Sequence, residues 1–200
     1  MRQLPLAIAP RPEPTLDNFI PGENAELLAR LRELAAGRLR ETVIYLWGAP
    51  ASGRSHLLAA CAAAGANVAD DVERLDAPGQ VELFHRINRA RESGGTVVAA
   101  GNAPPAALAL REDLRTRLGG GLVYQVQPLA DEEKARCLRA EAERRGLRLG
   151  DEVLDYLLSR VRRDMRSLAA VLDRLDALSL ELKRPITVPL AREALKAPGE

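Results

Sequence analysis

Cysteine is scarce in this 200-residue sequence, and its two copies stand apart from each other. Cys61 and Cys137 lie in alanine- and arginine-rich segments with helical periodicity, without a CxxC pair or a neighbouring histidine cluster. Structural zinc sites and thiol–disulfide centres need such pairs, so the spacing supports neither. We expect both thiols to be small packing residues in a reducing cytoplasm.

A large net charge and a long apolar run are also missing. The formal net charge is +1, which argues against a broad, charge-driven grip on nucleic acid. No window reaches the roughly 18 apolar residues of a membrane span, so neither export nor a membrane partner is expected and the cytoplasm is the expected location. Lysine is nearly absent, and a single arginine is therefore informative only where its position is special.

What the sequence does contain is an alternation of short apolar runs and helical patterns up to about residue 128. Residues 42–47, 96–102 and 119–128 are typical of strands, with a weaker strand at 66–69. Helical patterns cover 24–37, 55–65, 79–92 and, more briefly, 110–118. We expect Asn24 to cap the first helix and Gly37 to end it. This α/β alternation predicts a parallel sheet flanked by helices.

From Asp131 onward the pattern is only helical, over 131–146, 151–161, 164–183 and 188–196. Asp131, Asp151 and Asp164 stand where N-caps are expected. The sequence therefore predicts an extended, proline-rich tail over 1–14, an α/β domain over 15–128 and a small all-α domain over 129–200.

A phosphate-loop pattern joins the strand at 42–47 to the next helix. Gly48, Gly53, Arg54 and Ser55 match G-x-x-x-x-G-K-[ST], except that arginine replaces lysine. The glycines let backbone N–H groups turn toward a phosphate, and the helix adds its positive N-terminus. A glycine-rich turn without a ligand is the alternative, but the flanking strand and helix favour nucleotide binding. Arginine binds as a fixed fork, so we expect weak ATPase activity or none.

Asp70 and Asp71 follow the short run at 66–69 as a Walker-B-like pair. The first carboxylate would hold Mg²⁺ through water, and the second would orient an attacking water. Such a pair at a strand end is often only a solvated turn, and the order of the motifs is what favours the metal site.

Six motifs in order resemble the ATPase core of the replication initiator DnaA, an AAA+ protein: TLDNFIPGEN, GAPASGRSHLL, VADD, AAGNAPP, LRTRLGGGL and RDMRSL. Together they span nearly the whole chain. The phosphate-loop arginine and the QLPLAI start make the sequence most similar to the Hda family, the DnaA-related regulatory inactivators of that initiator. The resemblance implies an AAA+ P-loop sheet followed by an all-α lid domain.

The resemblance also implies an adenine nucleotide as cofactor, with ADP expected and Mg²⁺ as a candidate ion. Arg117 would be a trans-acting arginine finger, with Arg115 as its nearby competitor. His56 is more typical of a packing or surface residue than of a metal ligand, and Arg162 or Arg163 competes with Arg166. The implied nucleotide-site residues are Phe19, Ile20, Pro21 and Gly22 at the adenine, Gly48, Gly53, Arg54, Ser55 and His56 at the phosphates, Asn102 as sensor 1, Arg166 as sensor 2, and Asp70 as the metal ligand.

One departure from the family concerns the sheet. Related proteins have a further strand between the phosphate-loop helix and the aspartate pair, whereas here Gly65 runs almost directly into Asp70. We therefore expect a sheet that lacks one edge strand, with 66–69 as the new edge. The shortened connection leaves open whether the Walker-B region supports Mg²⁺ binding.

The tail carries aliphatic side chains at alternate positions, namely Leu4, Leu6 and Ile8, next to Gln3, on a segment in which proline prevents a helix. A disordered terminus is the alternative, but disordered segments are poor in aliphatic residues. The resemblance implies that these four residues dock on the DNA polymerase III beta sliding clamp.

Together the motifs imply a clamp-tethered regulator that promotes hydrolysis of ATP bound to the DnaA initiator. It would thereby inhibit initiation of chromosomal DNA replication and meet DNA mainly through the clamp. The rival is an autonomous AAA+ ATPase, such as a helicase loader or remodelling factor, which steady turnover by the purified chain would favour. A DNA-binding initiator fragment is the third possibility, but no helix-turn-helix pattern supports it. Self-association and direct DNA contacts stay open.

Overall fold

The computed structural model describes residues 13–160 and 165–196, with side chains described as far as residue 160 and again from residue 169. One structural unit spans Pro12–Leu129, and a second begins at Ala130. Within the described part of the chain, no helix combines the length and the apolar character that a membrane crossing requires.

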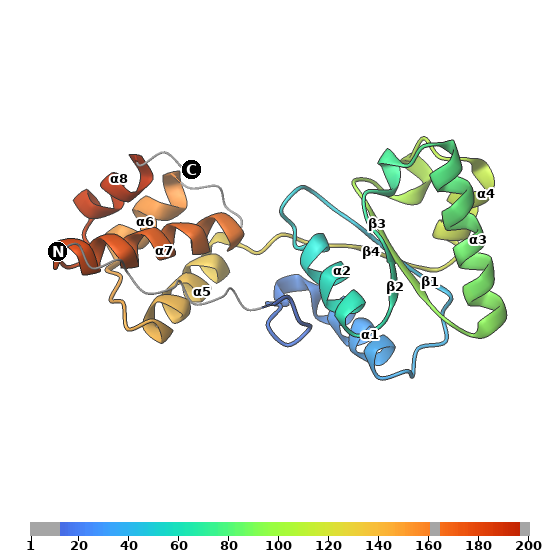
Figure 1. Ribbon diagram of the computed structural model, residues 1–200, viewed down its shortest axis with the longest axis horizontal. Helices are drawn as coiled ribbons and strands as arrows, with labels where there is room; N and C mark the ends of the chain where they lie inside the picture. Colours follow the sequence, from blue (N-terminus) through green and yellow to red (C-terminus); the bar gives the residue numbers. More distant parts are fainter. Residues whose placement is uncertain (1–12, 161–164, 197–200) are drawn as a thin grey trace, which may run out of the picture. The chain divides into compact units, whose positions relative to one another are not determined.

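The first unit alternates strands and helices (Figure 1). Its elements in chain order are η1 (Gly22–Asn24), α1 (Ala25–Ala35), β1 (Val43–Trp47), α2 (Arg54–Ala63), β2 (Asn67–Ala69), η2 (Val72–Arg74), α3 (Ala77–Ser93), β3 (Val97–Gly101), η3 (Pro105–Ala107), α4 (Glu112–Gly119) and β4 (Leu122–Gln125). The strands form a four-stranded parallel sheet in the order β2-β3-β1-β4. The predicted parallel sheet is confirmed, and β2 is its short edge strand.

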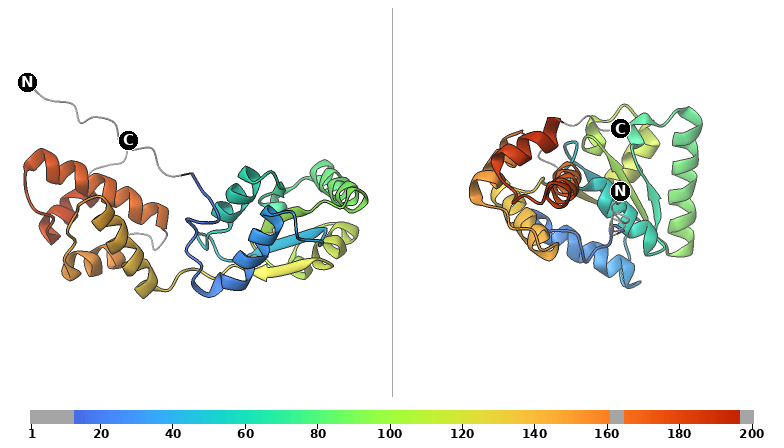
Figure 2. Two further views of the ribbon diagram at one scale, coloured as in Figure 1. Left: turned by 90° about the horizontal axis from the view of Figure 1, so that it is seen from below. Right: turned by 60° about the vertical axis from the view of Figure 1, so that its left-hand side comes forward.

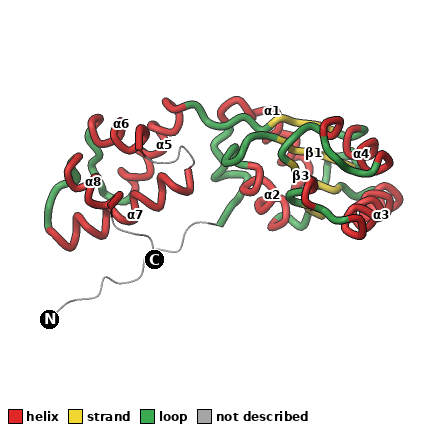
Figure 3. Tube along the Cα trace, turned by 90° about the horizontal axis from the view of Figure 1, so that it is seen from above, coloured by secondary structure: helices red, strands yellow, loops and turns green. Residues whose placement is uncertain are grey.

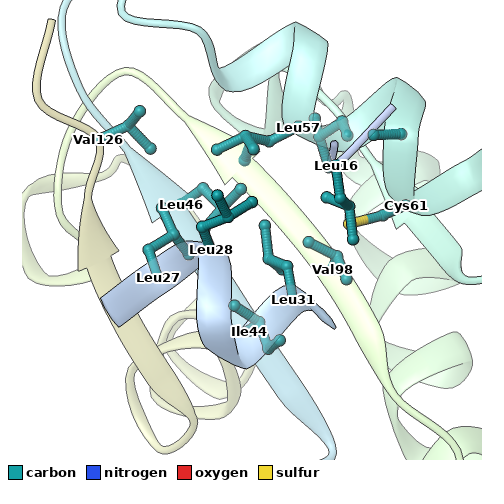
Figure 4. Packing of buried hydrophobic residues seen from close by; sticks show 13 residues of the cluster. Leu16, Leu27, Leu28, Leu31, Ile44, Leu46, Leu57, Cys61, Val98 and Val126 are labelled. Carbon is teal, nitrogen blue, oxygen red and sulfur yellow. The ribbon is translucent and has the colours of Figure 1, made fainter. Parts of the chain in front are cut away.

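Two hydrophobic cores cover the two faces of the sheet (Figures 1 and 2). Alternate residues of β1 supply them, because side chains of a strand point to opposite faces. Ile44 and Leu46 pack with α1 and α2, as Figure 4 shows, whereas Val43 and Tyr45 pack with α3 and α4. Residues 43–46 are therefore buried on both sides, which explains their unbroken apolar run.

The outer edge of β2 is covered by a side chain. Arg86, on α3, donates hydrogen bonds to Asn67 Oδ1 and, at 2.6 Å, to the carbonyl oxygen of Val68. An open strand edge offers unpaired backbone groups to other chains, and a cation placed there discourages such pairing. Arg86 thus protects the edge that the absent outer strand leaves.

Three predictions about helix starts were wrong. Asn24 occupies the position before α1, but its side chain makes no capping hydrogen bond there and instead bonds to the backbone of Gln127, 103 residues away in the sequence. Ala130, not Asp131, occupies the N-cap position of the first lid helix. Asp131 is the first residue of its helix, and Asp151 is likewise the first residue of its own helix, with Gly150 before it. At both positions the carboxylate is still stabilised by the positive end of the helix. Asp164 lies outside the described residues.

The second unit is all helical in its described part (Figure 3). It contains α5 (Asp131–Arg144), α6 (Asp151–Arg160), α7 (Met165–Leu182) and α8 (Val188–Lys196). Its core includes Leu138, Leu157, Leu172, Leu175 and Leu190. Arg145, the residue that follows α5, bonds to both Glu141 on α5 and Asp173 on α7, which ties the end of α5 to α7. The hydrogen bond from Arg144, together with one from Arg145, lowers the pKa of Glu141 to about 2.

Gly121 allows β4 to lie close against β1. A Cβ atom added there would come within 2.3 Å of the Val43 carbonyl oxygen and 2.7 Å of Val43 Cβ. We predict that Gly121→Ala lowers the free energy of unfolding by about 1–3 kcal/mol, because the crowding atoms belong to a packed strand. Urea denaturation followed by fluorescence of Trp47, the sole tryptophan, measures it.

Gly95→Ala is the matched control, because its added Cβ would meet no atom closer than 3.5 Å. We expect that change to stay within about 0.5 kcal/mol of wild type. Equal stabilities for the two variants would contradict the close approach of β4 to β1.

Candidate functional site

The loop that joins β1 to α2 depends on two glycines. Gly53 has a φ of +104°, and a Cβ there would lie 2.9 Å from the Phe19 ring. A Cβ on Gly48 would lie 2.6 Å from the carbonyl oxygen of Val126 and 3.0 Å from Ser52 Oγ. Ser52 Oγ is buried and has no hydrogen-bond partner among the described residues. Space and backbone conformation both require glycine, as the phosphate-loop pattern predicts.

Arg54, the first residue of α2, reaches across to the end of β3. Its guanidinium donates a hydrogen bond to the carbonyl oxygen of Gly101, the residue before Asn102. The loop arginine is therefore anchored on the segment in which the sequence predicts a sensor. A lysine with its single ammonium would not present the same rigid fork to that carbonyl.

Ser55 and Asp70 are brought together at the carboxyl end of the sheet. Ser55 Oγ donates to Asp70 Oδ2 over 3.4 Å. In the described part of the chain, no group of three or more His, Cys, Asp and Glu side chains could hold a metal ion. A Mg²⁺ ion here would use these two oxygens and would keep several waters, which is its usual habit.

Asp71 takes a different direction from Asp70. Its backbone has a φ of +46°, and its carboxylate lies 3.3 Å from the guanidinium of Arg74 in an exposed pair. The structure thus brings only the first aspartate to Ser55.

The segment before α1 packs onto the phosphate loop. The ring of Phe19 lies against Gly53, with its centroid 5.5 Å from that of His56. His56 Nε2 lies 3.0 Å from the carbonyl oxygen of Thr15, which anchors the histidine to the same segment. Ile20 is half-buried, Pro21 is exposed, and Gly22 has a φ of +48°. The structure therefore brings together Phe19, from the predicted adenine segment, and Gly53 and His56, from the predicted phosphate site.

Tyr45 and Glu73 also belong to this end of the sheet, although the sequence analysis missed them. The Tyr45 hydroxyl donates to the carbonyl oxygen of Ala103 at 2.8 Å, and Glu73 Oε2 accepts from the backbone N–H of Asn102 at 3.3 Å. Burial, with the nearby Glu73 carboxylate, raises the pKa of Tyr45, while the Arg54 charge opposes it. A hydroxyl in an otherwise apolar strand was the one local signal. Together they fix the backbone around Asn102, whose own side chain is exposed.

Arg117 lies in the last turn of α4 and packs against an aromatic ring. Its guanidinium carbon is 5.8 Å from the centroid of Phe84 on α3, a cation–π distance. Within the described residues no carboxylate pairs with Arg117, and its side chain is half-buried. The ring orients the cation without neutralising it. Arg115, the predicted competitor, has no such aromatic contact among the described residues.

Some predicted site residues cannot be placed. Gln3, Leu4, Leu6 and Ile8 lie outside the described residues. Arg166 lies in the first turn of α7, and its side chain falls outside the described part.

Comparisons with known proteins bear on both units. Residues 131–195 match the family model described as Hda, lid domain. Domain III of DnaA from Thermotoga maritima is 22% identical, with a TM-score of 0.76 over 92% of this chain and 96% of that one. AMPPCP-bound DnaA from Aquifex aeolicus is 22% identical, with a TM-score of 0.71 over 85% and 67%. The RuvB Holliday junction branch migration motor from Thermotoga maritima is 18% identical, with a TM-score of 0.70, and the match covers 93% of this chain and 72% of that one.

At these identities the solved structures establish the fold. The predicted class, a parallel AAA+ sheet without one edge strand and with a helical lid domain after it, is confirmed.

The environment of Tyr45 makes stability pH-dependent in alkali. Its pKa is raised in the folded state, so its contribution is fully present below the unfolded pKa of about 10 and is lost as pH rises above it. We predict that Tyr45→Phe costs about 1 kcal/mol at pH 8, from the hydrogen bond to Ala103. Between pH 8 and 11 its free energy of unfolding should fall less steeply than that of wild type.

Urea denaturation by Trp47 fluorescence at each pH measures both effects. Tyr156→Phe, on α6 in the other unit, is the matched control and should follow the wild-type pH curve. Parallel curves for Tyr45→Phe and wild type would contradict the raised pKa.

Proposed function

Since this chain is a Hda- and DnaA-like AAA+ protein, we propose that it regulates the replication initiator DnaA by promoting hydrolysis of initiator-bound ATP. The observation that carries the proposal is the match of residues 131–195 to the Hda lid domain, directly after an AAA+ sheet. The reaction takes place in the initiator, and this chain supplies a group from outside.

Its own nucleotide in this proposal is ADP. The glycine loop, the Phe19 ring over Gly53 and the N-terminus of α2 suit a phosphate-bearing adenine ligand, and the similar DnaA of Aquifex aeolicus holds AMPPCP. Mg²⁺, if bound, would take Ser55 and Asp70 as ligands. Arg54 is anchored on Gly101, and Asp71 pairs with Arg74. These two contacts support the proposal that the chain's own ATP turnover is weak or absent.

Arg117 is the group offered to the partner. An arginine finger in trans stabilises charge that develops on the phosphoryl group, so it must be charged, oriented and unpaired. The contact with Phe84 and the absence of a carboxylate partner in the described part of α4's surroundings meet these needs.

The tether to the sliding clamp rests on the sequence of the tail. The tail would enter an apolar groove of the clamp as an extended peptide through Gln3, Leu4, Leu6 and Ile8. The prolines that follow would lower the conformational entropy that is lost when the tail binds. DNA would be met mainly through the clamp.

Nucleotide binding predicts a ligand-dependent shift in melting temperature. ADP should stabilise the wild-type chain by mass action. Gly53→Ala should abolish that shift, because its Cβ would both strain a φ of +104° and push on the Phe19 ring at 2.9 Å. Differential scanning fluorimetry with and without ADP measures the effect.

Gly37→Ala is the matched control. Gly37 also has a positive φ, +67°, but an added Cβ there meets nothing within 4 Å. Both changes strain the backbone by roughly 1 kcal/mol or more, and only Gly53→Ala should lose the ADP response. A wild-type chain that ADP does not stabilise would refute the nucleotide proposal.

The regulatory role predicts a specific loss in Arg117→Ala. This variant should keep folding, ADP binding and clamp docking but lose stimulation of DnaA-bound ATP hydrolysis, by about 10³- to 10⁵-fold for a fully effective finger. Phosphate release from ATP-loaded DnaA, with clamp loaded on DNA, measures it.

Arg115→Ala, two residues away on the same helix, is the control and should have a smaller effect. Leu4→Ala/Leu6→Ala should lose stimulation together with clamp retention and keep the folded core. If the Arg117→Ala variant stimulated DnaA-bound ATP hydrolysis as strongly as the wild type, Arg117 would not be an arginine finger. Steady ATP turnover by the purified wild-type chain, without DnaA, would favour the autonomous ATPase instead.

A further inference from the structure

Asn24 is a buried amide whose hydrogen-bonding groups are directed at two separate segments. Only 4% of the Asn24 surface is exposed to solvent. Nδ2 donates to the carbonyl oxygen of Gln127 at 2.8 Å and to that of Pro21 at 3.0 Å. Oδ1 accepts from the backbone N–H of Gln127 at 2.7 Å. The amide therefore holds both backbone groups of Gln127, much as a neighbouring strand would.

Gln127 stands between the sheet and the second unit. It follows Val126, whose N–H donates to the Trp47 carbonyl oxygen at 2.7 Å, and only Pro128 and Leu129 separate it from the second unit. Gln127 is thus a residue of the connection whose backbone is held by a buried side chain from the junction of η1 and α1.

The other end of the contact lies in the nucleotide site. Pro21 belongs to the segment that begins with Phe19, whose ring covers Gly53 of the phosphate loop. On the opposite side, Gly48 closes on Val126, because a Cβ there would come within 2.6 Å of its carbonyl oxygen. Two adjacent residues of the connection are therefore held in place: Gln127 by Asn24, which also bonds to Pro21, and Val126 by close contact with Gly48 of the phosphate loop.

We propose that Asn24 is a positioning residue that transmits nucleotide occupancy from the Phe19–Gly22 segment to the connection at Gln127 and so to the lid domain. The inference rests on the proposed nucleotide site. A ligand shifts a conformational equilibrium only through different contacts in the two states. ADP that orders the Phe19–Gly22 segment fixes Pro21, and the Asn24 amide then holds Gln127 more firmly.

The contact makes two readouts available. Exchange of the Gln127 amide hydrogen reports the bond to Asn24 Oδ1 directly. Spin labels at Ala62→Cys on α2 and Glu193→Cys on α8, both exposed positions, report the two units, in a Cys137→Ser background because Cys61 is buried. With Asn24 intact, we expect ADP to slow exchange of the Gln127 amide hydrogen several-fold. We also expect ADP to narrow the distribution of distances between the two spin labels.

Two variants test the contact. Asn24→Ala removes the whole amide. Asn24→Asp keeps the volume and the acceptor for the Gln127 N–H but removes both donors and sets a carboxylate against two carbonyl oxygens, so it tests the contact even where the alanine variant fails to fold. Asn18→Ala is the control, because the Asn18 side chain donates to Glu13 in the same segment and does not contact Gln127.

With ADP saturating, as shown by its effect on melting temperature, we expect both Asn24 variants to bind ADP yet to lose its effects on Gln127 exchange and on label distances. Asn18→Ala should keep both effects. A full ADP response in a folded Asn24 variant overturns the inference, as does a wild-type chain that binds ADP without either response. A wild-type chain that does not bind ADP refutes the proposed nucleotide site and the inference with it.

Discussion

Burial of β1 on both faces is the constraint on which the other features depend. Residues 43–46 contribute alternately to two cores, so the strand is fixed in height, register and twist between α1 and α2 on one face and α3 and α4 on the other. The phosphate loop begins at Gly48, directly after Trp47, the last residue of β1. A loop that starts from such a strand inherits a fixed position, which is what a preorganised ligand site requires.

The arginine in the loop changes what that position is used for. In a phosphate loop with lysine, the flexible ammonium follows the phosphates. Here the guanidinium is bonded to Gly101, while Glu73 holds the N–H of Asn102 and Tyr45 holds the carbonyl oxygen of Ala103. Three side chains thus stiffen three consecutive residues. In the proposed function, this stiffness supports recognition of one nucleotide state rather than passage through a reaction cycle.

The sequence predicts local features of this molecule well because they arise from local causes. The runs at 42–47 and 96–102 are strands since their residues are buried on both faces, and the glycines of the phosphate loop are required by backbone conformation and space. The contacts that organise the site are of another kind. Asn24 reads as an N-cap in any local window, because its true partner is 103 residues away. Gly101, whose carbonyl oxygen Arg54 contacts, and Phe84, whose ring lies against Arg117, are likewise far in sequence from the residues that they meet.

The guarded edge at β2 has a consequence for how this fold can vary. Gly65, with a φ of +84° and no atom within 4 Å of an added Cβ, forms an open turn directly before that strand. Extra chain inserted at this turn would emerge beside Asn67 and Val68, where the Arg86 side chain occupies their oxygens. An inserted strand that joined the sheet there would displace that guanidinium. Because β3 lies between β2 and β1, such an addition would not contact β1 directly.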